Sequence, residues 1–165
     1  IIGKSFSDDM RETTLGGYYA AGGQGDKKLI YRTDVINSVP EYPVFSGEKY
    51  VGLVYKYTLI DQKYKLYVLN DAVCEVEYQP NGSSGTMWRQ YLQNPRGFAF
   101  LRKTAMQYPV SKKRLVKDCI HYCSSSQIAK NSNYIKESPR KVLTVFCSPL
   151  GWILTGIIRR KVKSI

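Results

Sequence analysis

Apolar residues recur at helical spacing after the turn-forming pair Ser46-Gly47. The pattern predicts a helix that begins at Glu48, where backbone N–H groups and the helix dipole favour a carboxylate. Glu48 then either complements the dipole only or presents an acid or base to a substrate. The apolar face of this helix is predicted to consist of Tyr50, Leu53, Val54, Tyr57 and Ile60.

Strand-like patterns flank this segment on both sides. Lys28–Thr33 reads as a strand, and Asp34 is expected to cap a short helix that ends before Pro40. Leu66–Leu69 and Val73–Tyr78 read as a hairpin joined at Asn70-Asp71. We therefore expect an α/β fold with a small mixed sheet built from residues 28–33 and 66–78.

The second half of the chain has helical periodicity. A helix carrying Trp88 is predicted to stop at Asn94-Pro95, and only helices are expected from Arg96 onward. Ser111 is predicted to cap one of these helices. On that helix Cys119 and Cys123 are four residues apart, which predicts a shared face and buried thiols.

Charge divides the chain into two regions. Residues 1–100 carry equal numbers of acidic and basic side chains, so the formal net charge of +12 arises entirely in residues 101–165. Such asymmetry predicts an anionic partner, namely a phospholipid surface, a lipid phosphate or nucleic acid. We therefore separate residues 1–100 from a basic helical region, 101–165, that is expected to dock on a membrane surface.

The run Val142–Ile158 contains no charged residue, and basic residues bracket it. It is shorter than the ~20 residues that a spanning helix needs, and Pro149 and Gly151 interrupt it. We expect an interfacial or re-entrant hairpin with Trp152 as an interface anchor and a new helix starting at Ser148-Pro149. Two amphipathic helices packed on the core of the protein are the alternative.

The sequence contains no clear motif for a signal peptide or for a metal site. The first residues, Ile1-Ile2-Gly3, resemble neither an initiator nor a signal peptide, which suggests a piece of a longer chain. His121 is the single histidine, and the cysteines lack CxxC spacing, so no metal site is expected within these residues.

Several short motifs occur in a characteristic order along the chain. Together they resemble the C-terminal half of family 2 glycosyltransferases of the GT-A fold, over nearly the whole chain. The resemblance implies transfer of a hexose-type sugar from a nucleotide-sugar to an acceptor, usually with inversion. In bacteria the acceptor is often a saccharide linked to lipid at the inner face of the membrane, in cell-envelope polysaccharide biosynthesis. The motifs are Gly25-Asp26-Lys27, Ile30–Thr33, Tyr42–Tyr50, Glu77–Ser83 and Asn94–Gly97.

The resemblance also implies that part of the enzyme lies upstream. In the family, the nucleotide-binding βαβ half and the Asp-x-Asp motif precede these motifs, and Asp8-Asp9 does not match the metal site. A divalent metal, Mg²⁺ or Mn²⁺, is expected in the complete enzyme but not in this part. The chain alone is therefore expected to be inactive and to contribute the acceptor side.

Glu48 matches the first carboxylate of the acidic motif in this family, which makes it the candidate catalytic base. Lys49 occupies the place of the second carboxylate, so it is expected to contact a phosphate. Asp26 and Tyr50 are further substrate-binding candidates, and Asp26 is the next carboxylate to consider as the base.

The donor diphosphate is expected to contact a second group of residues. Gly82 and Ser83 lie in a loop whose backbone N–H groups suit phosphate oxygens. Arg89 is placed to face the leaving group, or else lies on a solvated helix face. Trp88 either stacks on a sugar ring or belongs to the core.

Two other classes of function compete with the enzyme. One is a nucleic-acid-binding module, because the chain is basic and rich in tyrosine. However, the aromatic residues concentrate in the neutral half, so nucleic acid is not expected as a partner. The other is a non-catalytic module that binds anionic lipid. The location expected for either the enzyme or the lipid-binding module is cytoplasmic and peripheral at the inner face of the membrane.

Overall fold

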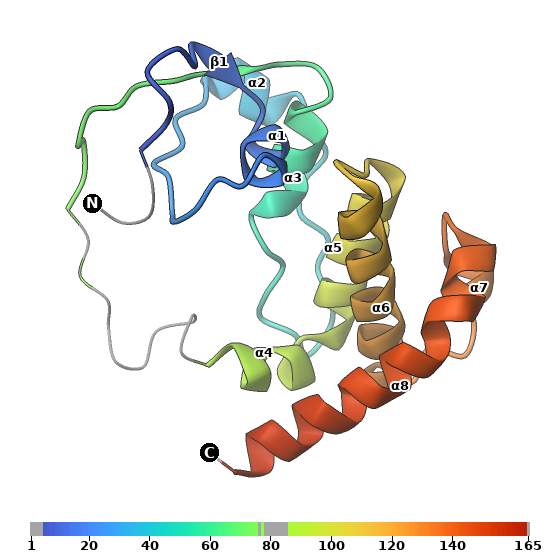
Figure 1. Cartoon of the computed structure of the whole chain (residues 1–165). Coiled ribbons are helices and arrows are strands. Elements are labelled where there is room, and N and C mark those ends of the chain that lie inside the picture. The colour runs from blue at the N-terminus through green and yellow to red at the C-terminus, as the bar shows by residue number, and fades with distance from the viewer. Residues whose placement is uncertain (1–4, 76, 78–85, 165) are drawn as a thin grey trace. The chain divides into compact units, whose positions relative to one another are not determined.

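The computed structural model describes residues 5–75, 77 and 86–164 (Figure 1). The chain forms two compact units, which are described separately. The first combines residues 1–41 with 56–78, and the second combines residues 42–55 with 79–165. The functional division at residue 100 stays a prediction, because these units follow packing and not charge.

The first unit contains a small antiparallel sheet. Strand β1, Glu12–Thr13, pairs with strand β2, Leu66–Tyr67. Thr14 caps the following helix α1, Leu15–Ala20, by accepting a hydrogen bond from the backbone N–H of Gly17 at 2.9 Å. Helix α2 is Thr33–Asn37, and the unit also includes the part of helix α3, Val54–Ile60, from Lys56 onward.

Two strand predictions for this unit are wrong. Residues 28–32 form no strand, and Thr33 already belongs to α2, whose presence before Pro40 was predicted correctly. The predicted cap is wrong, because Asp34 lies inside the first turn of α2 and Arg32 is the N-cap residue. The expected hairpin partner also fails, because β2 pairs with β1 and residues 73–75 have no strand. Val73 is 61% exposed and Cys74 is also exposed. The alternating pattern of this segment therefore does not correspond to a buried face. Val76 and Tyr78 of this predicted strand lie outside the described residues.

The second unit is helical, as predicted. The described residues after Arg96 contain helices and no strand, and Ser111 caps the helix Lys112–Ile128 by accepting a hydrogen bond from the backbone N–H of Arg114. The mixed α/β class with a helical C-terminal region is thus confirmed. The helices are α4 (Met87–Gln93), α5 (Pro95–Gln107), α6 (Lys112–Ile128), α7 (Tyr134–Glu137) and α8 (Lys141–Lys163).

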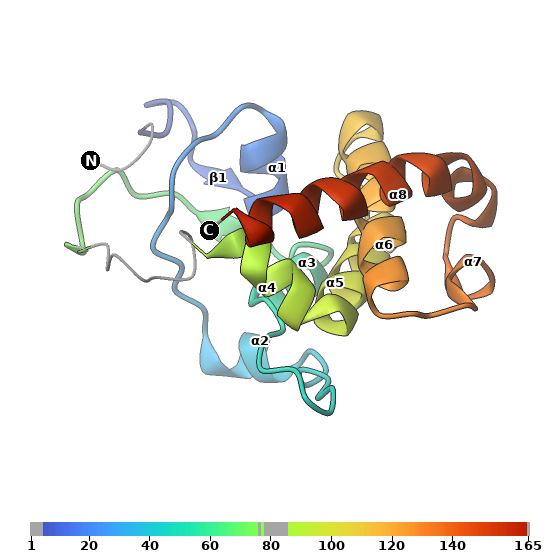
Figure 2. The same ribbon diagram turned by 90° about the horizontal axis from the view of Figure 1, so that it is seen from below.

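Helix α6 lies at the centre of this unit, with α5 and α8 packed against it (Figures 1 and 2). Cys119 and Cys123 are buried on its inner face as free thiols, as predicted. Asp118, 1% exposed, binds Arg102 of α5 at 2.7 Å and Arg114 of α6 at 3.0 Å. These two ion pairs compensate the cost of burying the Asp118 carboxylate between the helices.

The C-terminal run is a single helix. Pro149 lies inside α8, so the predicted hairpin and the predicted helix start at Ser148-Pro149 are both wrong. Proline removes one backbone hydrogen bond and disfavours a helix by about 3 kcal/mol. Contacts with α6 on both sides of the proline compensate: Cys147 before it and Gly151 after it are both buried.

The helix predicted from Glu48 begins later. Residues 48–52 have no helical structure, and α3 starts at Val54. The predicted apolar face is also wrong at Leu53 and Val54, which are 61% and 49% exposed. The prediction is confirmed at Ile60, which is 2% exposed, and α3 also buries Tyr55, which was not predicted to be on that face.

Candidate functional site

Glu48 follows a tight turn. The backbone N–H of Glu48 donates to the carbonyl of Phe45 at 3.0 Å, and Gly47 has a φ of 77°. Glycine adopts this left-handed conformation without the clash that a Cβ atom would cause. The motif Ser46-Gly47-Glu48 therefore specifies a turn that directs the Glu48 side chain toward α5.

The carboxylate of Glu48 binds the first turn of α5. Its Oε1 accepts hydrogen bonds from the backbone N–H and the Nε of Arg96, at 3.0 and 2.9 Å, and its Oε2 accepts from the backbone N–H of Gly97 at 2.8 Å. Arg96 also donates to the carbonyl of Ser46. Glu48 thus complements a helix N-terminus, as its position suggested, but the helix is α5 and not its own.

Asn94 ties the same two segments together from the other side. Its buried side-chain oxygen accepts from the backbone N–H groups of Lys49 at 2.9 Å and Tyr50 at 3.1 Å. Gly97 lies against the carbonyl oxygen of Tyr50. Two sequence motifs separated by more than forty residues therefore form one interlocked framework.

This geometry places Glu48 in a positioning role. Both of its oxygens are occupied, and its side chain is only 5% exposed. A general base must reach the proton that it removes, through a direct or a water-mediated hydrogen bond. The catalytic role of Glu48 stays a prediction. In that role the carboxylate would have to release its hydrogen bonds to Arg96 or Gly97.

The structure brings two other predicted residues close to this framework. Tyr50 packs on Phe98 with ring centroids 5.2 Å apart, Phe98 packs on Tyr91 at 4.6 Å, and Tyr91 meets the edge of Trp88 at 6.3 Å. Trp88 is half-buried at the end of this aromatic row, so it belongs partly to the core. The row extends from the Glu48 framework to α4.

The remaining predicted residues are placed differently. The side chains of Lys49 and Arg89 are exposed in the second unit, whereas Asp26 is exposed in a loop of the first unit. Gly82 and Ser83 lie outside the described residues. Within residues 5–75, 77 and 86–164, no three His, Cys, Asp or Glu side chains are grouped to hold a metal ion. These residues do not fit the metal that the resemblance implies.

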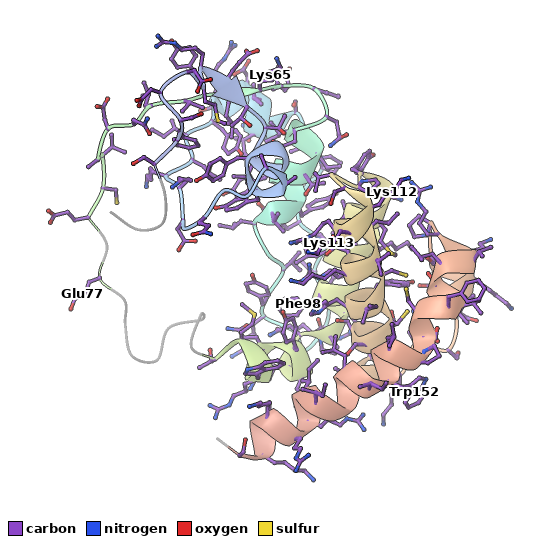
Figure 3. The ribbon with its side chains drawn as sticks, viewed as in Figure 1. Lys65, Glu77, Phe98, Lys112, Lys113 and Trp152 are labelled. Carbon is purple, nitrogen blue, oxygen red and sulfur yellow. The ribbon has the colours of Figure 1, made fainter. Side chains whose placement is uncertain are left out.

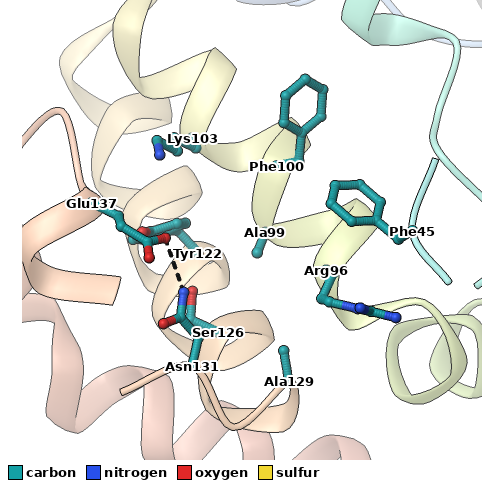
Figure 4. A pocket seen from close by; sticks show the side chains of 10 residues that line it. All are labelled: Phe45, Arg96, Ala99, Phe100, Lys103, Tyr122, Ser126, Ala129, Asn131 and Glu137. Atoms are coloured by element: carbon teal, nitrogen blue, oxygen red, sulfur yellow. Dashed lines mark hydrogen bonds between the residues drawn. The ribbon is translucent and has the colours of Figure 1, made fainter. Parts of the chain in front are cut away.

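A pocket of about 340 Å³ adjoins the Arg96 side of the framework (Figure 4). One part of its wall comes from the Glu48 turn and α5, and the other from α6 and the segment that follows it. Sequence reasoning missed this pocket, although Arg96, Phe100 and Lys103 have the i, i+4, i+7 spacing of one helix face. The lining residues are Phe45, Arg96, Ala99, Phe100, Lys103, Tyr122, Ser126, Ala129, Asn131 and Glu137.

The pocket contains a buried hydroxyl that is not fully used. Ser126 is 1% exposed, and its Oγ makes no hydrogen bond of good geometry within the described residues. Burial raises the pKa of Tyr122 to about 12, and the negative charge of Glu137 adds to this rise, whereas the nearby Ser126 hydroxyl opposes it. Tyr122 therefore stays protonated and donates to the carbonyl of Tyr134 at 2.7 Å.

Charged residues of both signs line the pocket. Lys103 and Arg96 come from α5, and Glu137 comes from α7, where it accepts a hydrogen bond from Asn131 at 3.0 Å. Lys103 lies beside Glu137, and Arg96 lies across from them (Figure 4). Phe45 and Phe100 add aromatic surface (Figure 4). Aromatic faces next to a few directed polar groups are the usual composition of a pocket for a small polar ligand.

Comparison of the chain with protein-family models, curated proteins and solved structures finds no match. The glycosyltransferase resemblance therefore depends on the order of the motifs alone. What the structure adds is the contact between two of those motifs, Tyr42–Tyr50 and Asn94–Gly97.

Proposed function

We propose that this chain forms the acceptor-side part of a GT-A-like family 2 glycosyltransferase, which moves a sugar from a nucleotide-sugar to a saccharide or lipid-linked acceptor. The observation that carries the proposal is the framework around Glu48. Two of the motifs that resemble the family, Tyr42–Tyr50 and Asn94–Gly97, meet at one turn and one helix start, through Glu48, Asn94 and Gly97. A framework of this kind holds an acceptor-binding loop rigid, which is what transfer to a positioned hydroxyl requires.

In this proposal the pocket beside Arg96 binds the acceptor saccharide. Its aromatic rings suit the apolar face of a sugar, and its polar groups suit sugar hydroxyls. Ser126 lines this pocket, and its Oγ makes no hydrogen bond of good geometry within the described residues. The nucleotide-sugar and the divalent metal that the resemblance implies would be held by an upstream segment.

Glu48 has a defined place in this proposal as a positioning residue. Its carboxylate keeps the turn against α5 and leaves Arg96 at the pocket wall. The alternative, direct removal of the acceptor proton by Glu48, requires the Arg96 contact to open in the complete enzyme. Stability and turnover measured on one variant distinguish these two roles, as described in the Discussion.

The proposed location is the cytoplasmic face of a membrane, with peripheral attachment. By length and composition α8 is a helix that could cross a bilayer, which bears weakly on membrane association. A lipid-linked acceptor would be reached from such a position.

The test uses the longer protein, with its upstream segment, and a panel of nucleotide-sugars with Mg²⁺ or Mn²⁺. We expect release of nucleoside diphosphate that depends on added saccharide or lipid-linked acceptor. Ser126→Ala should raise the acceptor KM by about 3- to 10-fold, the value of one hydrogen bond. Its unfolding free energy should change little, because the Ser126 Oγ makes no hydrogen bond of good geometry within the described residues.

Ser125→Ala is the matched control, since Ser125 is buried on the same helix but does not line the pocket. It should leave the acceptor KM unchanged. An unchanged KM in Ser126→Ala would reject the pocket as the acceptor site. Absence of nucleoside diphosphate release with every donor would reject the transferase itself.

A further inference from the structure

Helix α8 has its apolar and polar faces reversed relative to a helix on the surface of a water-soluble domain. Such a helix normally turns large apolar side chains inward and polar side chains outward. In α8 the exposed face is formed by large apolar side chains from Val142 to Ile157. They are Val142 (73% exposed), Val145 (52%), Phe146 (75%), Leu150 (48%), Trp152 (65%), Ile153 (60%) and Ile157 (44%). We call this set the outer face of α8.

The inner face of α8 consists mainly of small residues. Thr144 is fully buried, and the Oγ1 of Thr155 shares a hydrogen bond with the Oγ of Ser124 on α6 at 3.0 Å. Gly151 allows close approach, since a Cβ there would lie 2.5 Å from the Cβ of Cys123. Small and hydroxyl-bearing residues at a close helix contact are typical of helices whose other side faces lipid.

Charge at the ends of the outer face specifies the kind of surface that covers it. Arg140 and Lys141 precede it, and Arg159–Lys161 and Lys163 follow it, whereas α8 contains no acidic residue. A second copy of this chain would bring like charges together. Anionic phospholipid headgroups complement both ends at once, at about 1 kcal/mol for each basic residue near the surface.

The dimensions favour a helix that lies in the plane of the membrane surface. The uncharged run Val142–Ile158 is about 26 Å long at 1.5 Å per residue, shorter than the ~30 Å hydrocarbon core. Its inner face is covered by α6, whose first turn carries the exposed Lys112 and Lys113 (Figure 3). Only 28% of the most apolar 18-residue stretch of α8 is buried in protein. One side of the helix is therefore available to lipid, and the other is not.

We propose that the outer face of α8 inserts into the interfacial layer of an anionic phospholipid bilayer, with the helix axis parallel to the membrane. Phe146 and Ile153 lie at the apolar centre of the contact, and Trp152 lies at its edge, where an indole ring suits the headgroup region. The terminal basic residues contact lipid phosphates. This inference deepens the membrane location proposed above, and it does not require the transfer reaction.

The first experiment measures flotation of the chain 1–165 with phosphatidylglycerol-containing vesicles, without any donor sugar. The double variant Phe146→Glu/Ile153→Glu should lose at least about ten-fold in vesicle partitioning, because two carboxylates would have to enter the apolar layer. Binding of the unaltered chain should weaken with salt and be much weaker on zwitterionic vesicles.

The matched control is the double variant Ile30→Glu/Val44→Glu. These residues are 77% and 93% exposed, and both lie outside α8. The charge change is identical, so a general effect of added negative charge would appear equally in both variants. Circular dichroism should show unchanged helix content in both, since every substituted side chain is exposed. Equal loss of binding in the control, or undiminished binding in the α8 variant, would overturn the proposal.

The second experiment measures depth. In a Trp88→Phe background the fluorescence of Trp152 should shift to the blue on vesicle binding. It should also be quenched more by bromine near the headgroup end of the acyl chains than by bromine near the methyl end. Strongest quenching from the bilayer centre would overturn the in-plane arrangement in favour of a spanning helix.

Two further outcomes would reject the lipid assignment. One is a dimer in sedimentation that the Phe146→Glu/Ile153→Glu variant abolishes, without vesicle binding by either protein. The other is salt-dependent oligonucleotide binding with no vesicle binding. Loss of sugar transfer with vesicle binding intact would reject only the proposed enzyme, so the two failures are distinguishable.

Discussion

Gly97 is held so close to the backbone of Tyr50 that a Cβ atom at position 97 would lie 2.3 Å from the Tyr50 carbonyl oxygen. The backbone N–H of Gly97 also donates to Glu48. A side chain at position 97 would thus separate the two segments and lengthen that hydrogen bond. Glycine at the start of α5 is required by contact with another segment and not by its own backbone angles.

Gly97→Ala should therefore destabilise the protein by about 1–3 kcal/mol, the usual cost of overpacking. Gly156→Ala is the control on α8, because open space surrounds the added methyl group there. That change should stabilise the protein by up to about 1 kcal/mol through helix propensity. Urea unfolding measures both, and equal effects would contradict the close approach at Gly97.

Glu48→Gln should lower the unfolding free energy by about 1–3 kcal/mol. Each Glu48 oxygen accepts from an N–H group, so the amide nitrogen of glutamine would face a donor in either orientation. The same variant in the longer protein tests catalysis. If Glu48 is also the general base, turnover should fall about 10²–10⁴-fold at a temperature where the variant is still fully folded. If Glu48 is only a positioning residue, the folded variant should keep most of its turnover.

Asp118→Asn should cost about 3–5 kcal/mol, because it leaves Arg102 with an uncompensated charge between α5 and α6. Asp34→Asn is the matched control, since Asp34 also pairs with an arginine but is 64% exposed. Its effect on the unfolding midpoint should fall within the error of the measurement. A comparable loss in both variants would contradict the importance of burial.

Stability should fall between pH 6.5 and about 4 in a manner that depends on His121. Burial, with the positive charges of Arg102 and Lys117, lowers the pKa of His121 to about 4 in the folded protein. The unfolded chain therefore binds the extra proton first as the pH falls, and folding loses on the order of 2 kcal/mol across that window. The negative charge of nearby Asp118 raises the pKa of His121, and the positive charge of Arg114 lowers it further.

The difference between the unaltered protein and His121→Gln isolates this contribution. Glutamine does not titrate, so unfolding curves of the variant at several pH values should show a shallower decline over that window. Parallel declines in the two proteins would show that other groups cause the acid sensitivity.

Local signals sufficed where an element is determined by its own residues. Ser111 capped α6, proline followed the end of α4, and Cys119 with Cys123 formed a buried face. Each of these depends on residues within one or two turns of one another. That is why local signals located the end of α4 and the start of α6.

The site could be predicted only in part, because its contacts are long-range. The sequence singled out Glu48, Tyr50 and the Asn94–Gly97 motif, but it placed Glu48 on its own helix and not on α5. The Ser126 hydroxyl gave no signal, since it becomes part of a pocket only through the packing of α5 beside α6.

The same limitation explains the two larger errors. Pro149 predicted a break by local rules, and contact with α6 outweighed them. The β1–β2 pairing joins two-residue strands more than fifty positions apart, too short for alternation to reveal.

The order of the two units along the chain limits how this protein can be divided. The path leaves the first unit after residue 41, enters the second for residues 42–55, returns, and leaves again after residue 78. No single cut yields either unit whole, and a cut at residue 100 would strip most of α5 from the Glu48 turn. Neither unit can therefore be moved into another protein as one continuous segment of chain.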